Sequence, residues 1–345
     1  MRDQTVRLHT AILTDPQTIR ALLPAWDALA GRDPSATPYD TGTLMIGLGD
    51  LFGCAGAPYI VTARTEDDIL VGVLPLRRIH VGGRWGGKRL EGYSGWHTSY
   101  FDATVDPEWP HAISALLDAV EATRDWDRCD LRYLLPDGNL LRGEAARASA
   151  PDGFSQIVHR DAFGDRANSA ALGSHKAARR LAKAGEVCFT AAEPLDRIDA
   201  AIATFATLHT ERWAGRGDSA EFATPNAVTR LTAIIRDAAA AEWARVGTLR
   251  LSGEIIAVHL AFRWRERQFS WRMAHNAQWQ AMSPGRLLLS LMVEEAFASG
   301  CQQYDLGRGE EPYKRLWPTE GRPLSRIVIP GRSWRARLAA LRRSR

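Results

Sequence analysis

A short polar stretch near the C-terminus carries the side chains best suited to chemistry. It reads YDLGRGEEPYK over residues 304–314 and begins within a β-like run. A carboxylate grips or deprotonates an ammonium group, a phenol donates a proton, and a lysine ammonium stabilises developing negative charge. The candidate catalytic residues are therefore Asp305, Glu310, Tyr313 and Lys314. A solvated hairpin loop is the alternative interpretation.

A second group of candidates precedes an amphipathic stretch from Gly285 to Ala298. The first turn of a helix presents free backbone N–H groups and the positive end of the helix dipole, which together favour an anion. The candidate residues for binding an anionic cofactor here are Gln280, Ser283, Gly285 and Arg286. Ser-Pro-Gly before a helix is also ordinary N-capping with proline in the first turn, so both interpretations stay open.

Substrate binding has four candidate residues, and two of them form an Arg-Trp pair. Arg212 is able to clamp a carboxylate or phosphate, and Trp213 offers an amphipathic wall. Equally, Trp213 covers the core while Arg212 pairs with a local acid. Glu311 is a candidate for gripping an ammonium acceptor, and His275 completes the set, although a lone histidine on a strand is more often a core residue.

A basic segment, SHKAARRLAKAG, spans residues 174–185. Its cations recur every three or four residues, so a helix gathers them on one side. A solvated helical face is one interpretation, and contact with the phosphates of a nucleotide or tRNA is the other. The candidate phosphate or tRNA contacts are Lys176, Arg179, Arg180 and Lys183.

Length and composition indicate a globular protein with two domains. The chain has 345 residues, of which 45% are hydrophobic and 24% charged, and it carries a net charge of +4. Such a chain is longer than one hydrophobic core usually supports. Four scattered cysteines and no paired histidines at metal spacing argue against disulfides and a metal site. The absence of a signal peptide or a long apolar run predicts a cytoplasmic protein with no membrane span.

Hydrophobic periodicity shows the same order of elements twice. Each half runs strand, two helices, three strands, helix, strand. In the first half the expected elements are 6–13, 16–31, 44–52, 59–65, 69–81, 84–102, 110–123 and 130–135. In the second half they are 187–192, 198–213, 227–243, 245–251, 255–264, 268–275, 285–298 and 302–306.

This repeated order resembles a tandem version of the Gcn5-related acetyltransferase (GNAT) fold, a mixed α/β sheet with flanking helices. Residues 174–187, 208–217 and 283–314 sharpen the likeness. They are similar to the acetyltransferase-like family often found beside cellulose and exopolysaccharide biosynthesis genes, a relative of the Fem-type aminoacyltransferases. In those Fem-type relatives, an aromatic, a lysine and a second aromatic three residues later belong to the active-site region, as in Tyr313 to Trp317.

The resemblance implies three parts of the chain. These are an N-terminal GNAT-like domain over 1–150 that shapes the acceptor site, a linker with the basic helix over 151–185, and a C-terminal GNAT-like domain over 186–345 that holds the acyl donor. The family binds a pyrophosphate on a Q/R-x-x-G-x-G/A loop, and Gln280 to Gly285 fit that spacing except that Ser283 replaces the first glycine. No such loop lies between Tyr93 and Trp109. The strands on either side of the following helix are expected to splay apart around the acyl group.

The expected function is therefore acyl transfer from acyl-CoA, such as acetyl-CoA, to a small-molecule amine by direct attack. A first alternative is a Fem-like aminoacyltransferase that uses aminoacyl-tRNA and forms an amide bond. A second alternative is a non-catalytic GNAT-shaped scaffold in polysaccharide biosynthesis. No metal is expected, and the sequence leaves the acceptor and the oligomeric state open.

Overall fold

The computed structural model describes residues 7–53, 56–82, 87–93, 95–142, 149–165, 169–214 and 221–331. The chain divides into two compact units, each with its own strands and core. The first unit combines the chain up to Gly153 with the described residues from Pro323 onward. The second unit spans Phe154–Arg322.

The first unit builds its strands in the order β1-β2-β3-β4-β6-β13. Its first long helix begins after Asp15, whose carboxylate accepts a hydrogen bond from the Thr18 N–H at 2.8 Å, and proline at position 16 suits the first turn. The helices are α1 (Pro16–Arg32), α2 (Gly42–Leu51), α3 (Ala112–Ala122) and α4 (Asn139–Arg142). The strands are β1 (His9–Leu13), β2 (Ala57–Arg64), β3 (Leu70–Val81), β4 (Gly87–Gly92), β5 (Thr104–Val105), β6 (Arg128–Leu134) and β13 (Thr319–Pro330).

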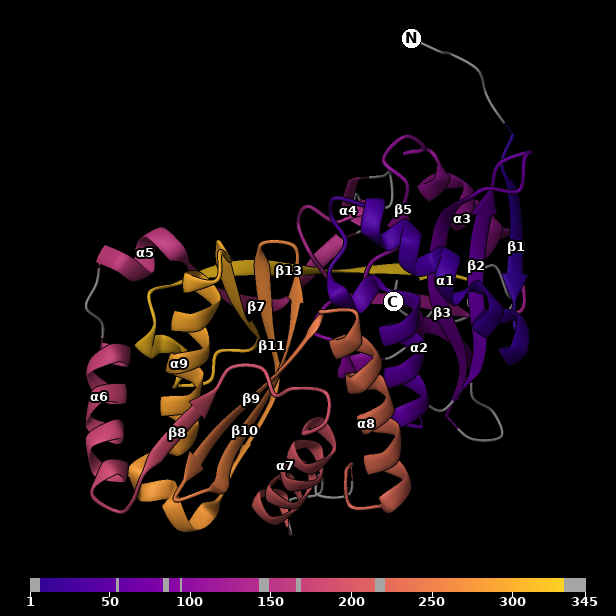
Figure 1. Cartoon of the computed structure of the whole chain (residues 1–345). Coiled ribbons are helices and arrows are strands. Elements are labelled where there is room, and N and C mark those ends of the chain that lie inside the picture. The colour runs from indigo at the N-terminus through magenta and orange to yellow at the C-terminus, as the bar shows by residue number, and fades with distance from the viewer. Residues whose placement is uncertain are drawn as a thin grey trace. The chain divides into compact units, whose positions relative to one another are not determined.

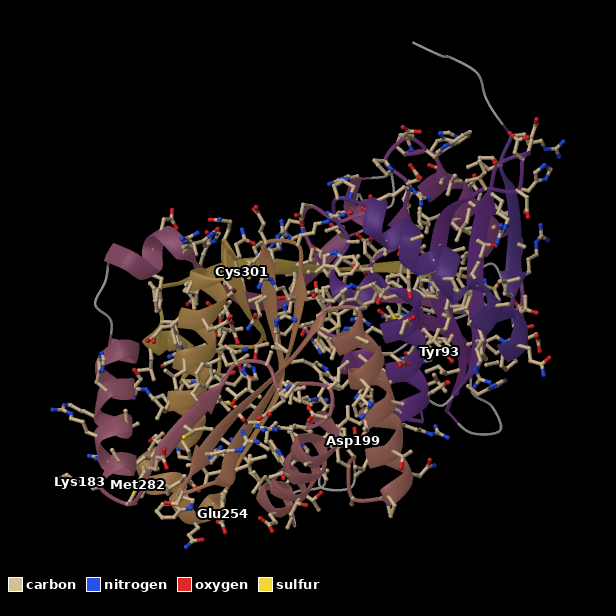
Figure 2. All side chains as sticks on the ribbon, in the orientation of Figure 1. Tyr93, Lys183, Asp199, Glu254, Met282 and Cys301 are labelled. Carbon is tan, nitrogen blue, oxygen red and sulfur yellow. The ribbon has the colours of Figure 1, made fainter. Side chains whose placement is uncertain are left out.

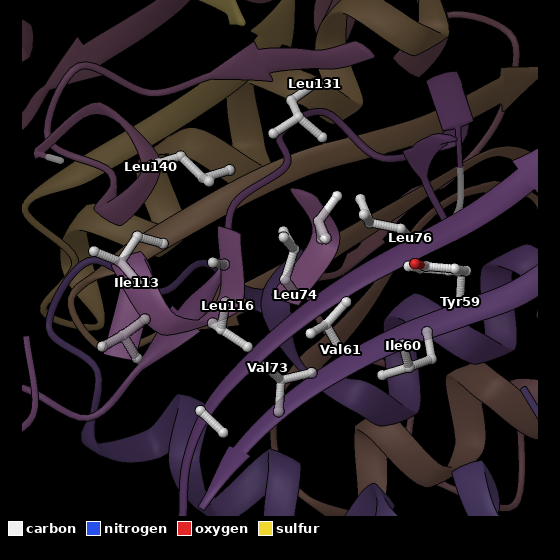
Figure 3. Close-up of a cluster of buried hydrophobic side chains, with 14 of the residues drawn as sticks. Tyr59, Ile60, Val61, Val73, Leu74, Leu76, Ile113, Leu116, Leu131 and Leu140 are labelled. Carbon is white, nitrogen blue, oxygen red and sulfur yellow. The ribbon is translucent and has the colours of Figure 1, made fainter. Parts of the chain in front are cut away.

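Part of the core of the first unit lies between strands β2, β3 and β6 and the helix α3. Val61 and Leu74 come from the paired strands β2 and β3, and Leu116 comes from α3 (Figure 3). All three are fully buried. Burial of each such side chain contributes about 1.5 to 3 kcal/mol.

The second unit builds its strands in the order β7-β12-β11-β10-β9-β8. In Figure 1, α6 and α9 lie on one side of these strands and α7 and α8 on the other. The helices are α5 (Arg160–Asp165), α6 (Ser169–Ala182), α7 (Ile198–Trp213), α8 (Pro225–Ala240) and α9 (Pro284–Ala298). The strands are β7 (Ser149–His159), β8 (Val187–Thr190), β9 (Ala244–Leu251), β10 (Glu254–Trp264), β11 (Arg267–His275) and β12 (Gln303–Arg308).

The predicted mixed α/β class and the repeated order are both confirmed. Apart from the short strand β5, the first unit runs β1, α1, α2, β2, β3, β4, α3, β6, and the second runs β8, α7, α8, β9, β10, β11, α9, β12. In each unit an antiparallel meander precedes a helix that crosses over to a parallel strand.

Each unit also contains one strand that the repeated pattern did not predict. In the second unit, β7 pairs antiparallel with β12 and precedes the rest of that unit in sequence. In the first unit, β13 pairs antiparallel with β6 although it follows the whole second unit in sequence. The strand that follows the first repeat in sequence, β7, thus pairs in the second unit, and the strand that follows the second repeat, β13, pairs in the first. We call this the exchange of β7 and β13. The expected C-terminal domain boundary at 186–345 differs from this grouping, because residues from Pro323 onward group with the first unit.

Both crossover strands separate from their parallel neighbours after a short contact. In the second unit, β11 and β12 pair only over Arg267–Phe269 and Gln303–Asp305, although both strands continue. In the first unit, β4 and β6 pair only over Arg89–Glu91 and Arg128–Asp130. This is the divergence that the resemblance led us to expect.

Buried carboxyl groups brace a loop of the first unit, and no motif or periodicity in the sequence indicated them. Asp40 accepts hydrogen bonds from the N–H and hydroxyl of Thr37, and Asp102 accepts from the N–H groups of Asn139 and Leu140. Burial raises the pKa of Asp40 to about 6 and raises the pKa of Asp102 as well. Their buried positions indicate a structural role.

Candidate active site in the second unit

The candidate active site is built where β11 and β12 diverge and α9 begins. Parallel pairing of the two strands stops at Phe269 and Asp305. The chain after β11 passes through the short helix η6 (Ala277–Met282) into α9. Along the chain, α9 therefore connects β11 to β12. The turn after β12 contains Tyr313.

Gly285 brings the start of α9 against His275, the last residue of β11. A Cβ atom added at Gly285 would lie 3.1 Å from the Nδ1 atom of His275. This contact is tighter than side chains normally make, so the glycine allows the close approach. The Nδ1 atom is buried and has no hydrogen-bond partner among the described residues. Burial, followed by the positive charge of Arg212, lowers the pKa of His275 and keeps the imidazole neutral.

Ser283 adopts the left-handed backbone conformation that glycine would adopt there. Its φ is 56° and its ψ is 51°, and its side chain does not cap α9. Pro284 follows as the first helical residue and has no N–H to donate. Ser283, which departs from the family's sequence pattern, therefore has a backbone conformation that glycine adopts more readily. The side chains of Gln280 and Ser283 are exposed, and Arg286 is partly exposed.

Arg212 lies near the end of α7 with an exposed side chain, and its guanidinium lies 5.9 Å from the ring of Trp213. Trp213 in turn packs near His209, with ring centroids 6.3 Å apart. The charge of Arg212 acts on the pKa of both His275 and Tyr313. Arg212 is far from His275 and Tyr313 in sequence, yet its charge reaches both side chains.

Tyr313 has a hydroxyl that stays protonated at neutral pH. Burial, followed by the negative charge of Glu311, raises its pKa, and Arg212 opposes this shift. The residue as a whole remains 38% exposed. The raised pKa keeps the phenol in its protonated form, in which the hydroxyl is a hydrogen-bond donor.

Lys314 lies at the base of this turn and is only 2% exposed. Its Nζ atom donates to the backbone carbonyls of Gly307 at 3.1 Å and of Arg308 at 2.5 Å. It also forms an ion pair of 2.8 Å with Glu311. A lysine ammonium has three protons, so these contacts account for its donors and hold the turn closed.

Asp305 and Glu310 occupy different environments. Asp305 is buried, and its Oδ1 atom accepts a hydrogen bond of 2.7 Å from the N–H of Gly307. This bond lies where the pairing of β12 with β7 shifts register. Glu310 is exposed. Of the predicted catalytic residues, Tyr313 is therefore the one that is both accessible and close to other candidates.

The basic residues lie on α6 and just beyond it. Lys176, Arg179, Arg180 and Lys183 are all exposed, whereas Ala177 and Leu181 are buried in the cluster that includes α9. Within the described parts of the chain, none of the four cations forms an ion pair. The helix also contacts η6, and Figure 2 shows Lys183 and Met282 at the same end of the unit.

His259 is a core residue. Its Nε2 atom lies 2.9 Å from the hydroxyl of Ser270, and its Nδ1 atom lies 3.5 Å from the hydroxyl of Tyr304. Burial lowers the pKa of His259 to about 4. It therefore stays neutral inside the sheet.

Comparison with known proteins assigns this region. Residues 174–315 match the family model described as an acetyltransferase (GNAT) domain. This segment is therefore similar to GNAT domains. It contains most of α6 and all of η6 and α9, and it ends one residue after Lys314. The candidate site therefore lies entirely inside the matched GNAT domain.

Solved structures with a similar fold cover nearly the whole chain. The C-terminal domain of a proposed lysylphosphatidylglycerol synthetase from Agrobacterium fabrum is 14% identical, with a TM-score of 0.60 over 94% of this chain and 96% of that one. FemX is 12% identical, with a TM-score of 0.59 over 92% and 96%. L-PGS from Bacillus licheniformis is 14% identical, with a TM-score of 0.57 over 96% of both chains. At these identities the likeness concerns the fold alone. No curated protein matches the chain.

The described residues offer neither a metal cluster nor a membrane-spanning helix. Among them, no group of histidine, cysteine or acidic side chains is arranged to hold a metal ion. No helix in the described part of the chain has the length and apolar character needed to cross a bilayer.

Proposed function

We propose that the GNAT domain of this chain transfers an acyl group from acyl-CoA to an amine by direct attack. One observation carries the proposal: the first turn of α9 packs against His275 at the end of β11, the strand whose parallel pairing with β12 stops at Phe269 and Asp305. A site of this kind aligns two substrates, stabilises charge and moves protons without a covalent enzyme intermediate.

The residues at the start of α9 fit a pyrophosphate donor. Gly285 lets the start of the helix pack closely against His275, and the helix N-terminus favours an anion. Acyl-CoA, when bound, supplies a thioester carbonyl for the attack. Gln280, Ser283 and Arg286 would flank the pyrophosphate, and Tyr313 would protonate the departing thiolate.

The other polar residues of the site have supporting roles in this proposal. Lys314 and Asp305 fix the turn that presents Tyr313, through their bonds to Gly307. Arg212 and Trp213 would hold the acceptor, and His275, kept neutral by burial, would accept its proton. Glu310 and Glu311 are exposed and would attract a cationic amine to the site.

A second candidate function is aminoacyl transfer from charged tRNA. The observation that favours it is the row of exposed cations on and beside α6, next to η6, which form no ion pair with any described residue. The fold of FemX adds support. In this case Lys176, Arg179, Arg180 and Lys183 would bind phosphates, and the donor would be an ester. Both donors are made in the cytoplasm, so either function places the protein there.

A thermal-shift experiment separates these functions. A ligand that binds only the folded state raises the melting temperature by mass action. Acetyl-CoA should raise it in the wild type and should fail to do so when Gly285→Val fills the space beside His275. Charged tRNA should act only if the second function holds, and that effect should disappear in a variant with all four basic residues of the α6 region changed to glutamine.

The outcomes also separate both enzymes from a scaffold. If acetyl-CoA and charged tRNA both leave the melting temperature unchanged, the proposal of acyl transfer is wrong, and a GNAT-shaped scaffold associated with polysaccharide synthesis becomes the better interpretation. If acetyl-CoA binds, a panel of small amines identifies the acceptor by release of free thiol.

A further inference from the structure

We infer that the first unit carries a site for an oxyanion, either a phosphate or a carboxylate group, on the arginine-rich face of β4 and β6. This arginine face is defined by Arg77 on β3, Arg89 on β4, Arg128 on β6 and Arg326 on β13. It lies outside the matched GNAT domain, and the inference does not depend on acyl transfer.

Two carboxylates lie at the centre of the arginine face. Glu91 accepts hydrogen bonds from Arg77 at 2.6 and 2.9 Å, and Arg89 lies 2.8 Å from its other oxygen. Asp130 accepts a bond of 2.5 Å from Arg326, and Arg128 lies 3.2 Å from it. Each acid is thus held between two arginines. Four guanidinium groups meet two carboxylates, which leaves a surplus of two positive charges.

Arg89 and Arg128 carry part of this surplus. These residues are direct partners in the parallel pair of β4 and β6, and Glu91 and Asp130 are partners further along the same pair. Like charges placed opposite each other on neighbouring strands are destabilising. The carboxylates of Glu91 and Asp130 offset only part of this repulsion, because each of them is shared between two arginines.

Unused hydrogen-bond donors identify where the oxyanion would bind. The Nε atoms of Arg89 and Arg128 are both buried, and neither has an acceptor among the residues that the structure describes. A buried donor without an acceptor is costly. The two side chains as a whole remain 36% and 33% exposed, so a ligand is able to reach them from solvent. An oxyanion on the exposed parts of the two guanidinium groups would lie against both charges, and a small rotation of either side chain would bring its Nε donor to the ligand.

The site is tested by titrating the full chain with inorganic phosphate and, separately, with succinate, by isothermal titration calorimetry at low ionic strength. The wild type should bind at least one of the two at a single saturable site. The ligand that binds more tightly assigns the site to phosphates or to carboxylates. Absence of saturable binding for both would overturn the inference.

The variant Arg89→Gln/Arg128→Gln should bind at least about tenfold more weakly, because two charge-assisted hydrogen bonds are lost. The matched control Arg20→Gln/Arg124→Gln removes the same charge from exposed positions of the same unit and should bind like the wild type. An equal loss in the control would show that net charge alone attracts the ligand, and would also overturn the inference.

A third variant, Arg89→Lys, keeps the charge but removes the planar guanidinium and should weaken binding several-fold. If the double variant does not fold, Arg89→Lys still tests the site, because it changes one residue and keeps its charge. Without ligand, the double variant should melt close to the wild-type temperature, because it removes a like-charge pair but also one of the two arginines on each carboxylate. Phosphate or succinate should stabilise the wild type and the control but not the double variant.

Discussion

Lys314 shows how a residue typical of catalytic chemistry can serve the shape of a site. Its ammonium is buried and bonded to two backbone carbonyls and to Glu311. We therefore expect Lys314→Met to destabilise the protein by roughly 2 to 4 kcal/mol, because two buried carbonyls lose charge-assisted donors. Urea denaturation measures the change.

Glu311→Gln is the matched control for this prediction. Glu311 is largely exposed, so losing its ion pair should cost less than about 1 kcal/mol. If Lys314→Met instead keeps wild-type stability and loses turnover, then Lys314 acts directly on the reacting atoms.

His259 predicts a specific pH dependence of stability. Its pKa is about 4 in the folded protein, below its ordinary value of 6.5. Between these values the unfolded state binds the proton more strongly, so stability falls as the pH decreases from about 6.5 toward about 4. The full effect is roughly 3 kcal/mol. Compared with His259→Gln, the wild type should lose this extra stability over that window in denaturation experiments.

The comparison between the two proteins isolates the histidine. Asp40, whose pKa is raised to about 6, gives the opposite slope, since its folded form binds the proton more strongly than its unfolded form. That slope is the same in both proteins and cancels in the difference. Parallel curves for wild type and variant would contradict the predicted titration of His259.

At the scale of elements, the start of α9 depends on one residue in a left-handed conformation. Ser283 has a φ of 56°, where a side chain is strained and glycine is not. Ser283→Gly should therefore leave stability unchanged or raise it by up to about 1 kcal/mol. It should also retain affinity for acetyl-CoA, because the backbone N–H groups keep their positions. Thermal unfolding with and without acetyl-CoA measures both.

Ser283→Val provides the contrast to this prediction. A β-branched side chain is poorly tolerated at positive φ, so this variant should lose more than about 1 kcal/mol. A folded Ser283→Gly variant that no longer binds acetyl-CoA would instead show that the serine hydroxyl contacts the donor.

At the scale of the whole molecule, each unit contains a strand that directly follows the other unit's repeat in sequence. Ile327 on β13 is fully buried in the core of the first unit, and Ile157 on β7 is buried in the second. Replacing either by alanine should cost about 2 to 5 kcal/mol. Ile327→Ala should weaken hydrogen-exchange protection of β6, and Ile157→Ala that of β12.

The two variants serve as controls for each other. Ile327 follows the second unit in sequence but packs in the first, and Ile157 follows most of the first unit but packs in the second. Sequence position would therefore predict a loss of protection in β12 for Ile327→Ala and in β6 for Ile157→Ala, which is the opposite of what the structure predicts. Loss of protection in β12 on changing Ile327 would contradict the exchanged arrangement.

Local signals predicted the repeated elements well, but not their partners. The helix expected at 198–213 is α7, because its apolar spacing and length are visible in the sequence. Strands β7 and β13 were missed, because their pairing partners lie in remote segments, although the alternating Ile327 and Ile329 hinted at β13. The burial of Lys314 and the pairing of Arg89 with Arg128 also depend on tertiary packing, which periodicity does not report.

The exchange of β7 and β13 sets the order in which the chain can be completed during synthesis. The ribosome makes β1 to β6 before the strands of the second unit, but β13, which pairs with β6, emerges only after those strands. Until then β6 presents an open edge, which other chains are able to pair with. The second unit has all of its strands, from β7 to β12, before β13 is made. The domain whose synthesis begins first is therefore the last to be finished.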